Sequence, residues 1–267
     1  IKFNDFLSQI PQIFIFSSSN FTRGIIMITF GLVLKNYISI LVIPEIDLVF
    51  NNLAEKNVVE TFIASTLFGI QIYADFGGYS LMALGICSIV GLTFPLNFNF
   101  PYNSKSIAEF WRRWHISLGR FFHQYMYLPL IKHNFISKNM AIMMVFFVSG
   151  IWHGIGVNFI VWGIFHGFAL IIEIYISRYV NIHQLVGRIY TLLVVILGWC
   201  LFRVEDINLL AHISWGFNSD FALIETLILG LIFILLVDVL MSLILIKYKN
   251  SYLLLLIAFP VLFCFAI

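Results

Sequence analysis

The segment MAIMMVFFVSGIWHGIGVNFIVWGIFHGFALIIEIYI, residues 140–176, decides the fold of this chain. It is nearly uncharged, and it far exceeds the roughly 18 residues that a helix needs to cross a hydrocarbon core of about 30 Å. Its length suffices for two spans, and the stretch from Gly154 to Asn158 is a place where one helix can end and the next begin. The segment therefore predicts two membrane helices joined by a break.

The composition of the whole chain agrees with this interpretation. Hydrophobic residues make up 61% of the 267 and charged residues only 10%, and the mean hydropathy is +0.99. Soluble domains carry about a quarter charged residues. We therefore expect an all-α, multi-pass membrane bundle of about seven or eight spanning or re-entrant helices, in one domain over residues 1–267. The other apolar windows are residues 21–44, 61–95 with a break at Gly77 and Gly78, 189–202, 221–246 and 251–267.

Charge and cysteine usage exclude several kinds of partner. The formal net charge of +2 is too small to indicate a nucleic-acid partner. Cys87, Cys200 and Cys264 are scattered in apolar segments without a metal-binding spacing, so neither a disulfide nor a bound metal is expected. One connection is rich in basic residues, which the positive-inside bias places on the cytoplasmic side. These residues are Arg112, Arg113, Arg120, Lys132 and Lys138.

The connection SKSIAEFWRRWHISLGRFFHQYMYLPL, residues 104–130, is predicted to form one helix that lies in the membrane interface. Ser104 or Ser106 can cap its amino end, Glu109 falls in the first turn, and Pro129 limits the helix. Apolar residues recur every three or four positions, as on a face that rests on hydrocarbon while arginines lie among headgroups. The residues on that face are Phe110, Trp114, Leu118, Phe121 and Tyr125.

His153 is the first candidate for chemistry because ionisable residues within membrane segments are rare and raise a functional hypothesis by default. Trp152 precedes it, and Gly154 follows it, so that another group can approach closely. Desolvation would keep the imidazole neutral, the form that accepts a proton from a hydroxyl. The alternative is a structural histidine that a neighbouring carbonyl satisfies.

Three further polar residues have both a functional and a structural interpretation. His115 follows two arginines in WRRWH, where it either serves the site or belongs to an interfacial belt that anchors the helix. Asp75 in QIYADFGGYS must be hydrogen-bonded, paired or protonated. It either orients a histidine or arginine or caps a helix end at the glycines. His166 has small neighbours in an apolar helix, and helix packing is its predicted role.

Several motifs of soluble enzymes are missing. The sequence contains no GxSxG nucleophile elbow, no Walker loop and no HExxH motif. A soluble type of hydrolase or an ATPase is therefore disfavoured.

Four motifs together resemble the membrane-bound O-acyltransferase (MBOAT) family, and in particular its bacterial branch of alginate and peptidoglycan O-acetyltransferases. The block EFWRRWHISL with WHG downstream is highly specific for that family. The chain departs from the branch at Leu81 and Gln124, where an acid is usual. Family members begin well before IKFNDFLSQI, so we expect several N-terminal helices to be absent here. The motifs are QIYADFGGYS, EFWRRWHISL, SGIWHGIGVNFIVWGIFHG and LGWCLFRVED.

The resemblance implies an acyltransferase whose helices surround a funnel or tunnel. It would move an acyl group, usually acetyl, onto hydroxyls of an extracytoplasmic polysaccharide such as alginate or peptidoglycan. His153 would be the catalytic residue, as a general base or as a transient acyl carrier, and His115 a second catalytic position that helps to place the donor. The residues expected to bind substrate are Arg112, Arg113, Trp152 and Asp75.

The same resemblance sets the expected surroundings and partners. No tightly bound cofactor is expected, because the acyl donor, acetyl-CoA or another thioester, is a substrate. The protein would cross the lipid bilayer of the bacterial plasma (inner) membrane several times. It would work with a periplasmic or membrane-anchored esterase-like transferase.

Two rival functions also fit polar groups in membrane helices. A transporter or channel would show paired helix interruptions in two related halves, whereas this sequence has one dense motif region without a second copy. A non-catalytic membrane scaffold for a periplasmic partner would tolerate the loss of both histidines.

Overall fold

The computed structural model describes residues 6–132, 136–216 and 221–232, and every regular element within these ranges is a helix. The all-α prediction is therefore confirmed. The chain divides into two compact units. The first comprises the described residues of Ile1–Pro44, Ile70–Leu96 and Glu225–Ile267, and the second comprises those of Glu45–Gly69 and Asn97–Ile224.

Four helical stretches are long and apolar enough to cross a membrane. They are Ser18–Phe50, Val58–Val90, Val157–Ile176 and Gln184–Arg203. The predicted seven or eight helices thus become four of full membrane length in the described part of the chain. A shorter apolar helix covers Phe221–Ile232, and the predicted window at 251–267 and Cys264 lie outside the described residues.

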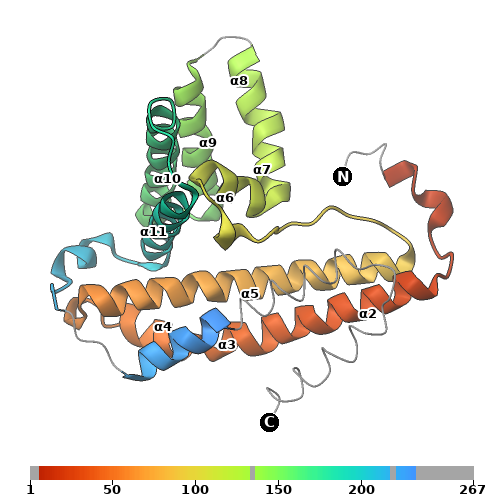
Figure 1. The fold of residues 1–267 in the computed structure, drawn as a ribbon, viewed down its shortest axis with the longest axis horizontal. Helices are drawn as coiled ribbons and strands as arrows, with labels where there is room; N and C mark the ends of the chain where they lie inside the picture. The colour runs from red at the N-terminus through yellow and green to blue at the C-terminus, as the bar shows by residue number, and fades with distance from the viewer. Residues whose placement is uncertain (1–5, 133–135, 217–220, 233–267) are drawn as a thin grey trace. The chain divides into compact units, whose positions relative to one another are not determined.

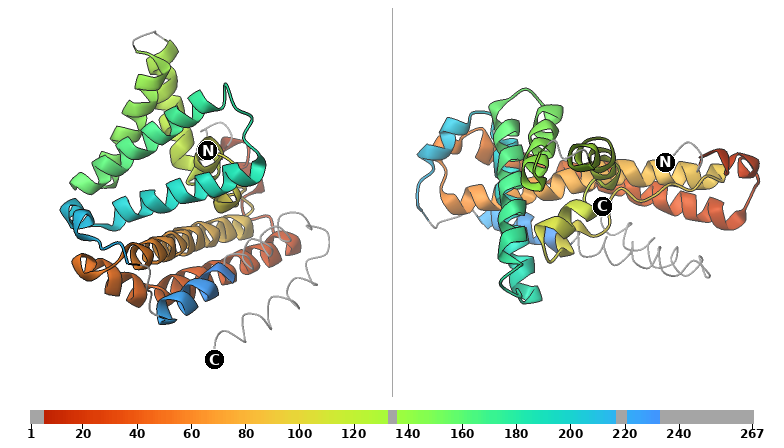
Figure 2. Two further views of the ribbon diagram at one scale, coloured as in Figure 1. Left: turned by 60° about the vertical axis from the view of Figure 1, so that its left-hand side comes forward. Right: turned by 90° about the horizontal axis from the view of Figure 1, so that it is seen from above.

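Close helix contact, and not a bend, explains four glycines of the first unit: Gly24, Gly31, Gly78 and Gly85. Helix α2 (Ser18–Val33) lies beside the second half of α5 (Val58–Val90), as Figures 1 and 2 show. A Cβ added at Gly78 would lie 2.6 Å from the carbonyl oxygen of Gly31, and one added at Gly85 would lie 2.6 Å from that of Gly24. The predicted break at Gly77 and Gly78 is wrong, because α5 continues through both residues.

Asp75 has a partner in the same unit. After α2 the chain forms a π-helical turn, Leu34–Ile38, before the short α3 (Ser39–Leu41) and α4 (Ile43–Phe50). Lys35 in this turn places its Nζ 2.5 Å from Oδ1 of Asp75. Asp75 therefore forms an ion pair, and the alternative that it caps a helix end is wrong because α5 does not end there.

The second unit contains two helices from the opening segment, and of these α10 (Val157–Ile176) is among the helices long and apolar enough to cross a membrane. Helix α9 (Lys138–His153) ends at the predicted break, and α10 begins just after it. Helix α10 packs against both α9 and α11 (Gln184–Arg203) (Figure 1). The break at Gly154 to Asn158 is confirmed.

The predicted single interfacial helix is divided at its centre. Helix α6 (Ile107–Arg113) is capped by Ser106, as expected, but the chain turns at Trp114 and His115 before α7 (Ile116–Phe122). A π-helical turn, His123–Tyr127, then leads into α8 (Leu128–Lys132), so Pro129 does not end the helical stretch. The turn also breaks the predicted apolar face: Phe110 and Trp114 are buried, whereas Phe121 and Tyr125 are exposed.

Candidate active site

His153 is the last residue of α9 and is surrounded by aromatic rings. Its ring centroid lies 4.9 Å from that of Trp152, 5.2 Å from that of Trp162 and 5.1 Å from that of Phe202. All three rings meet the imidazole edge to face. The side chain is partly buried and has no hydrogen-bond partner among the described residues. The alternative of a histidine satisfied by a neighbouring carbonyl therefore finds no support in this part of the chain.

The turn after His153 is held by two contacts. Gly154 makes room for the ring of Phe159, because a Cβ at position 154 would lie 2.4 Å from Cε2 of that ring. The buried side chain of Asn158 donates from Nδ2 to the carbonyl oxygen of Phe202, at 3.0 Å. The first contact packs the turn against α10, and the second ties the beginning of α10 to the end of α11, so together they fix where His153 lies.

His115 lies at the turn between α6 and α7 in a left-handed backbone conformation, with φ 42° and ψ 54°. A residue with a side chain costs roughly 1–2 kcal/mol in this conformation. Two backbone hydrogen bonds hold the strained turn: the Asn99 N–H donates to the Arg113 carbonyl and the Ile116 N–H donates to the Asn97 carbonyl, both at 2.9 Å.

The side chain of Asn97 extends this support to the imidazole. Its Oδ1 lies 3.3 Å from Nδ1 of His115, and it also accepts from the backbone N–H and the hydroxyl of Ser117, at 3.1 and 2.8 Å. An amide oxygen accepts and does not donate. A hydrogen bond here therefore requires the His115 proton on Nδ1 and leaves Nε2 as the acceptor nitrogen.

Trp152 brings the two candidate histidines together. Its indole packs against His153 and also lies 6.3 Å, centroid to centroid, from the ring of His115. Burial lowers the pKa of His115 to about 4, and the neighbouring His153 contributes in the same direction. His115 is therefore neutral near pH 7. The fold unites two residues that lie far apart in the sequence.

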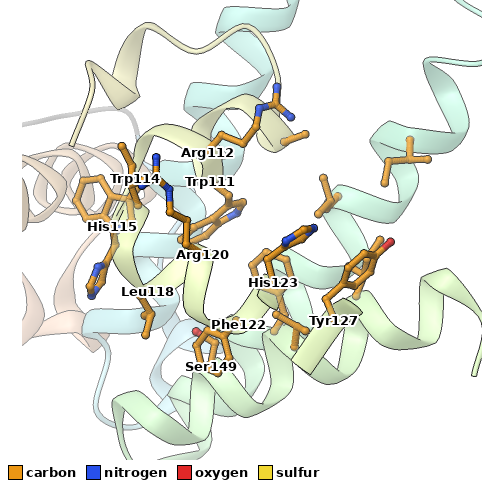
Figure 3. Close-up of a pocket in the computed structure, with 18 residues that line it drawn as sticks. Trp111, Arg112, Trp114, His115, Leu118, Arg120, Phe122, His123, Tyr127 and Ser149 are labelled. Carbon is orange, nitrogen blue, oxygen red and sulfur yellow. The ribbon is translucent and has the colours of Figure 1, made fainter. Parts of the chain in front are cut away.

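A cavity of about 700 Å³ opens beside His115 (Figure 3). Its walls come from α6, α7, the His123–Tyr127 turn, α9 and α10, and they are mainly apolar. Besides His115, its basic lining residues are Arg112, Arg120 and His123, the phenol of Tyr127 also lines it, and none of the described lining residues carries a carboxylate. Ser149, on α9, also lines it, whereas His153 does not. Of the two candidate histidines, His115 therefore contacts the cavity directly.

The predicted substrate-binding residues fall into separate places. Arg112 lines the cavity, whereas Arg113 is occupied by an ion pair with Glu109, at 2.6 Å. Asp75 lies in the first unit with Lys35. Trp152 is 58% exposed and contacts both histidines. All four assignments remain predictions about substrate.

His166, on α10, is more deeply buried than His153. It is 2% exposed, and its ring packs 4.9 Å from Trp111 and 5.2 Å from Trp162. Its Nδ1 is buried without a hydrogen-bond partner among the described residues. These contacts agree with the predicted role in helix packing.

Sequence reasoning missed three residues that support the site. Phe202 covers one side of His153, Asn97 contacts His115, and Glu173 accepts hydrogen bonds from the first turn of α6. Glu173 carried a usable signal, since it is a lone acid in an apolar helix. Asn97 and Phe202 act through contacts that only the fold creates.

Comparisons with known proteins identify the family of this chain. A family model described as the membrane-bound O-acyltransferase family, MBOAT, matches residues 1–214. The peptidoglycan O-acetyltransferase of Helicobacter pylori is 32% identical over 198 residues, which are 71% of this chain and 37% of that protein. The probable alginate O-acetylase AlgI of Azotobacter vinelandii is 34% identical over 194 residues, 70% of this chain and 38% of that protein.

A relative named for a different activity matches a smaller part of the chain. The teichoic acid D-alanyltransferase of Bacillus subtilis is 34% identical over 108 residues, 37% of this chain and 27% of that protein. The chain spans less than two fifths of the length of each of these three relatives.

Proposed function

Because this chain belongs to the membrane-bound O-acyltransferase family, we propose that its protein transfers an acyl group to hydroxyls of an extracytoplasmic polysaccharide. Acetyl is the proposed group, and alginate or peptidoglycan is the proposed kind of acceptor. The names of two relatives that match over about 70% of this chain support both choices. The D-alanyltransferase match supports only acyl transfer in general for the shared segment, because that relative is named for another acyl group and another polymer.

The single observation that carries the proposal is the contact of Trp152 with both His115 and His153. It joins the EFWRRWHISL and WHG motifs in one place. In the proposed reaction His153 accepts the proton of the acceptor hydroxyl while its oxygen attacks the acyl carbonyl. The bond between the acyl carbon and the thioester sulfur then breaks, and the proton passes to the departing sulfur. Correct placement and general-base catalysis together supply the acceleration.

His115 is proposed to place the donor. It lines the cavity together with Arg112 and Arg120, and donors such as acetyl-CoA carry negative charges that the two arginines can attract. The mainly apolar walls fit a flexible arm that carries the thioester. We further propose that the protein lies in the bacterial inner membrane and delivers its product with an esterase-like partner.

The experiment compares His153→Ala and His115→Ala with the exposed control His212→Ala in the full-length protein, at matched membrane levels. The readout is transfer from [¹⁴C]acetyl-CoA to cell-envelope polysaccharide, together with alkali-labile acetate on that polysaccharide in cells. Loss of a general base lowers the rate by about 10²- to 10⁴-fold, so His153→Ala is expected to lose nearly all transfer. Undiminished transfer by His153→Ala would end the assignment.

The transporter alternative receives no support from the family match. It makes the opposite prediction, namely solute flux in reconstituted vesicles without any acetyl incorporation.

A further inference from the structure

We infer that Glu173 is a positioning residue that sets the place of His115 by anchoring α6 to α10. Glu173 lies near the end of α10 and is 8% exposed. Its Oε2 accepts from the backbone N–H of Ile107 at 2.5 Å, and its Oε1 accepts from that of Ala108 at 3.1 Å. The inference rests on the proposed role of His115 in transfer.

The carboxylate of Glu173 completes the amino end of α6. The first N–H groups of a helix lack partners within the helix and carry partial positive charge. In α6 the Ile107 and Ala108 groups bond to Glu173, and the Glu109 group bonds to the hydroxyl of Ser106 at 3.0 Å. Of these partners, only Glu173 comes from another helix. A buried carboxylate is costly without such hydrogen bonds. The N–H groups of α6 therefore stabilise the buried carboxylate of Glu173, and the carboxylate in turn stabilises the amino end of α6.

A second contact holds α6 further along its length. The indole of Trp111 packs against His166 and Trp162 of α10, at centroid distances of 4.9 and 5.7 Å. Hydrogen bonds fix the direction of a short helix more strictly than side-chain packing does. Without Glu173, the amino end of α6 is held by packing, with Ile107 against Ala169 and Val194, and the helix is freer to tilt about Trp111.

Such a tilt would reach the candidate site. The last residue of α6 lies two positions beyond Trp111, about 3 Å along the helix axis, so a tilt of about 20° about Trp111 would move this end by about 1 Å. That end carries Arg112, which lines the cavity, and leads directly into the strained turn at His115. A displacement of about 1 Å at a reacting group can lower a rate by about 100-fold.

The test is a double-mutant cycle of Glu173→Gln and His115→Ala in the full-length protein, with [¹⁴C]acetyl-CoA as the donor. The glutamine keeps the shape of the side chain, but it presents an NH₂ group to one of the two N–H donors and removes the charge. We expect Glu173→Gln to lower kcat/KM for acetyl-CoA by about 10- to 100-fold in the wild-type background. In the His115→Ala background we expect a further loss of less than about twofold, because the affected residue is already absent.

A structural readout separates this inference from the proposed function. Carbethoxylation of His115 by diethyl pyrocarbonate, followed by mass spectrometry, reports the surroundings of the ring without any transfer reaction. Glu173→Gln is expected to change the rate at His115 several-fold while the rate at the exposed His212 stays the same. A changed rate in a protein that transfers no acetyl would overturn the proposed function and retain the positioning role.

Two controls guard against a general loss of structure. Glu205→Gln removes a carboxylate whose side chain is 92% exposed and should leave both readouts unchanged. If Glu173→Gln fails to fold, Glu173→Asp keeps the charge but withdraws it by one methylene, and the same comparison applies with a smaller expected effect. Equal losses in both backgrounds, or an unchanged rate of carbethoxylation, would overturn the inference.

Discussion

Nδ1 of His115 lies 3.3 Å from Oδ1 of Asn97, and a hydrogen bond at this contact requires the tautomer with its proton on Nδ1. The same amide oxygen holds Ser117, so it fixes both the imidazole and the first turn of α7. A ring held in this way presents Nε2 as its acceptor. The proposed placement of the donor by His115 depends on that orientation.

Replacing Asn97 with Leu removes the acceptor while keeping a similar volume. We expect kcat/KM for acetyl-CoA to fall by about tenfold, which corresponds to about 1.4 kcal/mol, the size of one lost hydrogen bond. Asn97→Asp keeps an acceptor oxygen and should retain most of the rate. Asn99→Leu changes an exposed neighbour and serves as the matched control. Equal losses at positions 97 and 99 would refute the tautomer argument.

The pH dependence of stability tests the burial of His115. Burial, with a smaller contribution from His153, lowers the pKa of His115 to about 4, while an unfolded histidine titrates near about 6.5. The unfolded chain therefore gains a proton over this interval that the folded chain does not. The contribution of His115 to the free energy of unfolding is therefore fully present above about pH 6.5 and is lost as the pH falls toward about 4.

The matching experiment compares the wild type with His115→Gln by thermal unfolding in detergent. From about pH 7 to about pH 5 the wild type is expected to lose more stability than the variant, because only the wild type carries this histidine. Other titrating groups are common to both proteins and cancel in the difference. Parallel curves would contradict the lowered pKa.

The neighbouring glycines of α5 provide a pair with opposite expected effects. A Cβ at Gly78 would meet the backbone of Gly31 at 2.6 Å, whereas one at Gly77 meets only the ring of Tyr73 at 3.7 Å. Gly78→Ala should therefore destabilise the contact between α2 and α5, by about 1–3 kcal/mol. Gly77→Ala should be neutral or stabilising by up to about 1 kcal/mol, because alanine favours a helix.

Unfolding by sodium dodecyl sulfate titration of the purified protein measures both variants. The wild type and Gly77→Ala should unfold at similar detergent fractions, and Gly78→Ala at a lower one. If Gly77→Ala is the damaging change, then α5 does require flexibility at this point, as the sequence alone indicated.

Hydrophobic length and composition were sufficient to predict the helical class and the break after His153. They failed at Gly77 and Gly78, because glycine serves a bend and a close helix contact equally well, and the difference depends on a partner 47 positions away at Gly31. They failed again at Trp114 and His115. The helical spacing of apolar residues continues through that point. The turn is imposed by two backbone hydrogen bonds, one between Ile116 and Asn97 and one between Asn99 and Arg113.

The candidate site was predicted in its residues but not in its arrangement. The two histidines and Trp152 were identified from motifs, while the sequence could not say that Trp152 contacts both rings. Arg112 and Arg113 are adjacent and chemically alike. Only the fold distinguishes them. On α6, Arg112 lines the cavity, whereas Arg113 lies one helical turn from Glu109 and forms an ion pair with it.

His166 provides the sharpest contrast with His153, since both lie in the same segment and contact Trp162. His166 is fully enclosed, and its Nδ1 lacks a partner among the described residues. Replacing a buried polar group that makes no hydrogen bond with an apolar group of similar size is close to neutral. We therefore expect His166→Leu to fold, to unfold at the wild-type temperature or above it, and to keep at least about half of the acetyl transfer. A folded His166→Leu protein without transfer would show that this imidazole takes part in the chemistry, and the division of roles between the two histidines would have to be reversed or shared.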